Sequence, residues 1–121
     1  MIEIKKIASG APWEETVGYS RAIKVGNNIE IAGTTAQGKD EYEQTVEIIK
    51  IAKDALEKLN ASLHDVVRTR IYCTNISNWK QIGTAHHEFF GAIKPVTTMI
   101  EVSRLITPEI LVEIEFSAIV N

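Results

Sequence analysis

The sequence has little of several residue types, and each shortage excludes a class of protein. It contains one cysteine, Cys73, and three prolines in 121 residues. A single cysteine cannot form an internal disulfide, so the chain does not read as a disulfide-stabilised secreted domain. No apolar run approaches the ~18 residues that span a membrane, and the first residues lack the basic-then-apolar order of a signal peptide. We therefore expect a cytoplasmic protein without a membrane partner.

Basic charge is not in excess either. Thirteen Lys and Arg residues against sixteen Asp and Glu residues give a net charge of −3, and no basic cluster exceeds Lys5-Lys6. Surfaces that bind nucleic acid carry clustered basic side chains, so the composition argues against a nucleic-acid partner. Hydrophobic residues make up 45% and charged residues 24%, as in globular proteins. The length suits one domain, which we expect over residues 1–121.

Hydrophobic periodicity predicts six strands and two helices. The strands are expected at residues 2–7, 19–25, 29–33, 66–74, 96–102 and 111–120, with a long loop at 8–17 and a turn at 26–28. The first helix is expected at 40–59, with an apolar stripe at Tyr42, Val46, Ile49, Ala52, Leu56 and Leu59. The second is expected from Ser77, as its cap, to Gly91. The order β-β-β-α-β-α-β-β predicts an α+β fold, a mixed sheet of roughly six strands with two helices.

This order predicts that one face of the sheet lacks helices. Two right-handed crossovers place both helices on the same face. The other face is expected to carry Ile119, Met99 and either Thr69, Ile71 and Cys73 or the residues that alternate with them. A sheet face that mixes apolar side chains with carboxylates usually meets a partner subunit, so we expect an oligomer.

The last strand carries two carboxylates on one side. Alternation places Glu113 and Glu115 on the same face, ~7 Å apart, with Val112 and Ile114 on the other. In one interpretation, one carboxyl is a general acid or base whose pKa is raised by burial or by its neighbour. In the other, the two carboxylates lie on a solvated outer face. The spacing alone leaves both open.

Other candidate residues favour structural roles. His86 falls on the apolar stripe of the second helix and is expected to be a satisfied core histidine. His87 points ~100° away from it, so the pair cannot easily share a metal. Cys73 lies in a β-branched strand and is expected to be a small buried residue. No metal site is predicted.

Two C-terminal segments carry a family resemblance. Residues 95–105 (PVTTMIEVSRL) and 112–120 (VEIEFSAIV) resemble the C-terminal signature of the Rid, or reactive intermediate deaminase, family, also called YjgF. The match continues in register through residues 18–22, 25–26, 31–34 and 65–69. The resemblance implies a chorismate-mutase-like fold and a homotrimer that binds a small molecule in clefts between subunits. It implies no metal or organic cofactor.

The resemblance also implies site residues. The deaminase branch hydrolyses imines or enamines derived from amino acids to a ketoacid and ammonia. By position, Glu113 matches the residue that positions the water, Tyr19 matches the cleft tyrosine, and Ala32 and Gly33 match the wall beside them. Three further pocket positions depart from the deaminase pattern. Thr97 replaces the arginine that grips the substrate carboxylate, Gly83 replaces a helix asparagine, and Met99 replaces cysteine or a similar small residue.

The missing arginine leaves two functions open. A threonine offers one hydroxyl, whereas arginine offers a charged fork to a carboxylate. The chain is either a hydrolase that acts on a small unsaturated nitrogen compound through Glu113 and water, or a non-catalytic metabolite-binding or regulatory protein. Arg21 follows Tyr19 by two residues on a predicted strand, and we hypothesise that it partly replaces the missing charge. Alternatively, Arg21 pairs with Glu113 or Glu115, or faces solvent.

Overall fold

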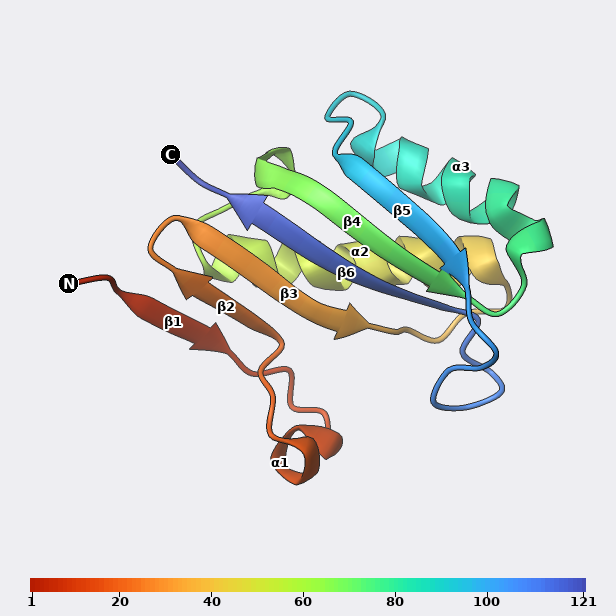
Figure 1. Cartoon of the computed structure of the whole chain (residues 1–121), viewed down its shortest axis with the longest axis horizontal. Coiled ribbons are helices and arrows are strands. Elements are labelled where there is room, and N and C mark those ends of the chain that lie inside the picture. Colours follow the sequence, from red (N-terminus) through yellow and green to blue (C-terminus); the bar gives the residue numbers. More distant parts are fainter.

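The strands form one six-stranded sheet in the order β1-β2-β3-β6-β4-β5 (Figure 1). The computed structural model describes residues 1–121. The strands are β1 (Ile4–Ile7), β2 (Ala22–Val25), β3 (Asn28–Thr34), β4 (Val66–Cys73), β5 (Val96–Glu101) and β6 (Val112–Ile119). Only the β4–β5 pair is parallel, which makes the sheet mixed, as predicted. In this strand order, the last strand of the sequence, β6, lies between β3 and β4 in the middle of the sheet.

The helices are α1 (Trp13–Val17), α2 (Glu41–Lys58) and α3 (Trp79–Phe90), with 3-10 turns η1 (Leu63–Asp65) and η2 (Ile76–Asn78). The order of the six strands and two long helices is the predicted one. The loop expected at 8–17 instead contains α1, and the strand expected from residue 19 begins at Ala22. Ser77 does not cap α3. It lies in η2, where its N–H donates to the Asn75 side chain, and Asn78 is the residue that precedes α3.

Both long helices pack on one face of the sheet. Val112, Ile114, Phe116 and Ala118 of β6 all join a core of eighteen buried apolar residues, to which α2 contributes Ile48 and Leu56 and α3 contributes Ile82 and Phe90. The buried stripe of α2 lies further round the helix than predicted. The predicted stripe residues Ile49, Ala52, Leu56 and Leu59 are buried. Tyr42, however, is 36% exposed, and its hydroxyl donates a hydrogen bond to Glu88 of α3 at 2.6 Å.

The other face of the sheet carries no helix. Thr69, Ile71 and Cys73 point into the core, so the open face takes their alternates, including Arg70 and Tyr72. Ile119 lies on the open face as predicted. Met99 does not, because it pairs with Ile71 and packs against the core. The register of the parallel β4–β5 pair decides this point, and the sequence of β5 alone did not reveal it.

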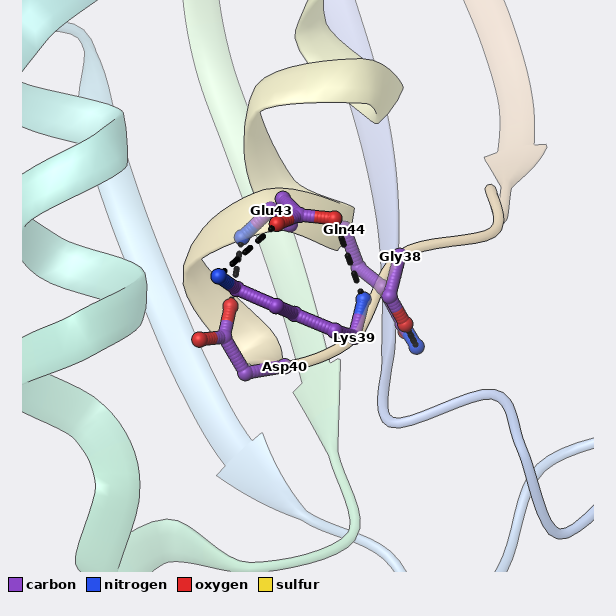
Figure 2. Close-up of polar contacts among 5 residues, drawn as sticks. All are labelled: Gly38, Lys39, Asp40, Glu43 and Gln44. Carbon is purple, nitrogen blue, oxygen red and sulfur yellow. Dashed lines mark hydrogen bonds and ion pairs between the residues drawn. The ribbon is translucent and has the colours of Figure 1, made fainter.

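Local polar contacts fix the start of α2 (Figure 2). The Asp40 carboxylate accepts a hydrogen bond from the Glu43 N–H at 2.9 Å, which caps the helix. Gln44, 1% exposed, donates to the carbonyls of Gly38 at 3.1 Å and Glu109 at 2.8 Å, and its carbonyl accepts from the Leu111 N–H at 2.8 Å. Gln44 therefore ties the loop before α2 to the segment that enters β6. No helix combines the length and hydropathy that crossing a bilayer requires.

Candidate functional site

Glu113 lies at the edge of an open hollow of about 330 Å³ between β3, β6 and the α1 segment. Its neighbours Val112 and Ile114 are buried in the core, so the alternation of β6 turns Glu113 to the opposite face, where it is half-buried. Eight residues line the hollow: Trp13, Val17, Tyr19, Ala32, Gly33, Thr35, Ile106 and Glu113. The structure thus brings together four of the predicted site residues, Tyr19, Ala32, Gly33 and Glu113.

A bulge in β3 brings the backbone of Gly33 against the Glu113 carboxyl. Ile31 pairs with Phe116 and Thr34 with Ile114, so Ala32 and Gly33 together oppose one residue of β6. A Cβ at Gly33 would overlap the Glu113 carboxyl group. A side chain at this position would therefore require the Glu113 carboxyl to move from its place against the bulge.

Burial raises the pKa of the Glu113 carboxyl above its ordinary value, and the nearby charge of Glu115 raises this pKa further. The Arg21 guanidinium acts in the opposite direction and lowers the same pKa. A carboxyl with a raised pKa exchanges its proton closer to neutral pH, which is the property that a general acid or base requires. The neighbouring Glu115 carboxylate accepts a hydrogen bond from the Tyr72 hydroxyl at 2.7 Å.

Arg21 is buried and engaged with β3. It is 9% exposed, and its Nη1 donates to Thr34 Oγ1 at 2.7 Å, the Gly33 carbonyl at 3.3 Å and the Ala32 carbonyl at 3.4 Å. No carboxylate forms an ion pair with it. These contacts indicate that Arg21 holds the bulge in place. Its suggested role in holding a ligand charge stays a prediction.

The other three predicted site residues, Gly83, Thr97 and Met99, lie at the far edge of the sheet. Thr97 is an exposed residue of β5, and its hydroxyl contacts Thr69 Oγ1 at 2.9 Å. Thr69 in turn contacts His86 Nε2 of α3 at 3.0 Å, one turn beyond Gly83. Thr97 pairs with Thr69 on the helix-covered face, whereas Glu113 is on the open face. One chain alone therefore does not bring the two groups together.

Two core residues match their predicted roles. His86 stacks on Phe90 with ring centroids 4.7 Å apart, and burial, followed by the neighbouring His87, lowers the pKa of its imidazole. Cys73 is fully buried, and burial raises the pKa of its thiol. No group of three or more His, Cys, Asp or Glu side chains is placed to hold a metal ion.

Sequence reasoning missed the apolar wall of the hollow. Trp13, Val17 and Ile106 were assigned to loops, but they line the hollow while remaining 46%, 71% and 68% exposed. Trp13 and Val17 are four residues apart on α1 and so share one side of this short helix. This four-residue spacing of two apolar residues was the sequence signal that could have revealed the apolar wall. Tyr19 and Ala32 also line a larger hollow of about 740 Å³ over the open face, to which Arg70 and Glu115 contribute.

Comparisons with known proteins show the family. The family model described as Endoribonuclease L-PSP matches residues 10–120. The chain is similar to a solved Mycobacterium tuberculosis structure of the YjgF/YER057c/UK114 family, with 47% identity, a TM-score of 0.96 and coverage of 98% of this chain and 100% of that one. It is 38% identical to a RutC family protein of Pyrococcus abyssi, over 80% of this chain and 82% of the relative.

A more distant relative has a named activity. The chain is 27% identical to a 2-iminobutanoate/2-iminopropanoate deaminase of Dermatophagoides farinae, over 84% of this chain and 86% of the relative. The family match covers the α1 segment, the β3 bulge and β6, which together form the hollow around Glu113. The chain belongs to the Rid, or YjgF, family.

Proposed function

We propose that three copies of the chain form a homotrimer, which binds a small imine or enamine in clefts between subunits and hydrolyses it through Glu113 and water. The observation that carries this proposal is the Glu113 carboxyl, half-buried against Gly33 in a hollow with apolar walls. The deaminase name of the Dermatophagoides relative supports the same reaction type.

The chemistry requires one group that moves a proton twice. The ionised Glu113 carboxylate takes a proton from water as the oxygen attacks the C=N carbon and passes this proton to the nitrogen, which gives a carbinolamine. The carboxylate then takes the proton of the carbinolamine hydroxyl and passes it to the nitrogen, so that the C–N bond breaks, the C=O group forms and ammonia leaves. A raised pKa suits both transfers, because the proton is held neither too weakly nor too strongly near neutral pH.

The open face of the sheet supports the trimer. Val96, Ile100 and Ile119 are 56%, 45% and 51% exposed on the strands β5 and β6. A neighbouring chain that covers this face would bury them. It would also allow the β5 edge of one chain, with Thr97, Met99 and Gly83, to approach the Glu113 hollow of the next.

The alternative is a trimer that binds a metabolite without converting it. Thr97 favours this alternative, because a neutral hydroxyl replaces the arginine that the deaminase pattern uses for the substrate carboxylate. An endoribonuclease activity, which the description of the family model names, fits the net charge of −3 poorly.

The test is stopped-flow hydrolysis of small imines, with and without a carboxylate. We expect the protein to accelerate the loss of imine absorbance, and Glu113→Gln to reduce the acceleration by about 100-fold or more. Glu47→Gln, at an exposed position on α2, serves as the matched control and should leave the rate unchanged. If the wild-type protein binds ligands but does not accelerate hydrolysis, the non-catalytic alternative is correct.

A further inference from the structure

The walls of the Glu113 hollow point to a class of ligand. None of the eight lining residues is basic, and Glu113 is the one acidic residue among them. Trp13, Val17 and Ile106 present exposed apolar side chains to the same space. A ligand in this hollow therefore meets apolar surface and a carboxyl, and no cation.

Arg21 is the nearest cation to this wall, and it lies behind the wall rather than in it. It is not among the residues that line the hollow, and its Nη1 donates to three acceptors on β3. Its charge reaches Glu113 through space, and its Nε is buried without a hydrogen-bond partner beside an adjoining hollow that Tyr19 and Gly33 also line. With 9% of its surface exposed, Arg21 presents little contact surface to a ligand carboxylate.

The edge strand offers no cation at the predicted positions either. In the trimer, the residues expected to approach the hollow from the next chain are Gly83, Thr97 and Met99, none of which is charged. An anion that enters such a space loses its hydration and gains no counter-charge, and an ionised Glu113 would repel it. An apolar group gains by entering, because it covers exposed tryptophan, valine and isoleucine side chains.

We propose that this cleft selects neutral imines or enamines that carry an apolar substituent, which rests on Trp13, Val17 and Ile106, and that it discriminates against carboxylates. The proposal rests on the function proposed above, and it names the substrate class of that site. Trp13 is the main specificity residue, since its side chain is the largest of the three.

Stable ketone analogues test this selectivity without turnover. 2-Oxobutanoate and 2-oxobutanamide have nearly the same shape and differ in charge, and 4-methyl-2-oxopentanamide adds a branched apolar group. Binding to the full-length protein is measured by calorimetry at pH 7.5. We expect 2-oxobutanamide to bind at least tenfold more tightly than 2-oxobutanoate, and the branched amide to bind about tenfold more tightly again.

Two variants locate the effect. Trp13→Ala should remove most of the advantage of the branched amide and leave the shorter amide within threefold. Trp13 lies outside the core, so the fold should persist, which circular dichroism checks. Tyr42→Ala, which removes a partly exposed aromatic side chain from α2, is the control and should change no affinity. Equal or tighter binding of the carboxylate, no binding of any of the three, or an unchanged preference in Trp13→Ala would overturn the proposal.

The imine assay separates this proposal from the catalytic one. If carboxylate-bearing imines are preferred and Glu113→Gln abolishes their hydrolysis, the selectivity proposal fails and the function stands. If the amides bind selectively and no imine is hydrolysed, the selectivity stands and catalysis fails.

Discussion

At the scale of single residues, the chemistry of the site depends on how the fold surrounds one carboxyl. Glu113 and Glu115 share one side of β6, but their surroundings differ. Glu115 accepts a hydrogen bond from Tyr72, whereas Glu113 lies against the Gly33 backbone beside apolar side chains. The β3 bulge creates this difference, because it brings Gly33 close to one carboxyl and not the other.

The raised pKa of Glu113 predicts a pH-dependent stability. The folded protein holds this proton more tightly than the unfolded chain, whose carboxyl has the ordinary pKa of 4.5. The free energy of unfolding should therefore fall as the pH rises from about 4.5 through the folded pKa. Glu113→Gln removes this dependence. The melting temperature of Glu113→Gln minus that of the wild type should therefore increase as the pH rises from 4 to 8. Thermal melts at several pH values check this. Parallel curves for wild type and Glu113→Gln would contradict it.

Arg21 gives a second prediction at this scale. Arg21→Met removes three hydrogen bonds to the bulge and should lower the free energy of unfolding by about 2 kcal/mol, measured in urea. Arg104→Met, at an exposed arginine, is the control and should have little effect. Unchanged stability together with lost ligand binding would instead make Arg21 a ligand residue.

The sequence allowed part of this site to be predicted. Strict alternation in β6 placed Glu113 on the face away from the core, since a central antiparallel strand obeys a period of two. Hydrophobic periodicity did not place Trp13 or Ile106 in the site. A five-residue helix is too short to show a periodic pattern of apolar residues, and an irregular loop has none. Periodicity also could not place Arg21, whose contacts depend on an extra residue in β3 that changes no pattern.

At the scale of elements, the sequence predicted types and order better than boundaries and faces. The apolar stripe identified α2, and Asn60, with a φ of 59°, takes the left-handed conformation just past its end. The buried stripe of α2 differs from the predicted one because it includes Gln44 and Thr45, which are both polar. A prediction based on polarity places such residues on the solvent side of a helix. Their hydrogen-bond partners, which lie up to 67 residues away, make their burial possible.

Gln44 therefore should control the entry into β6. Gln44→Leu keeps the volume but leaves the Gly38 and Glu109 carbonyls and the Leu111 N–H without partners. We expect the free energy of unfolding to fall by about 3 kcal/mol and the Leu111 amide to exchange faster with deuterium. Gln37→Leu, at an exposed position in the same loop, is the control. Equal protection of Leu111 in both variants would show that Gln44 does not hold this segment.

At the scale of the whole molecule, the two faces of the sheet are unequal. One is covered by α2 and α3. The other exposes Ile100 and Ile119 beside charged residues such as Arg70. A face of this composition is better suited to another protein surface than to water alone.

The proposed trimer predicts a molar mass in light scattering about three times the 13.5 kDa of one chain. Ile100→Lys should shift the mass toward that of one chain, because it places a charge in the proposed interface. Ile51→Lys, at a position of α2 that is 38% exposed, should leave the mass unchanged. A wild-type mass of 13.5 kDa at micromolar concentration would refute the trimer.

The central place of β6 also orders events during synthesis on the ribosome. β3 and β4 both pair with this strand, which is the last of the six strands to be made. Until it emerges, two apolar strands have unpaired edges, and Gly33 has no carboxyl beside it. The nascent chain thus completes its sheet and its candidate site in one late step. A chain that stops before Val112 loses the middle of its sheet along with Glu113.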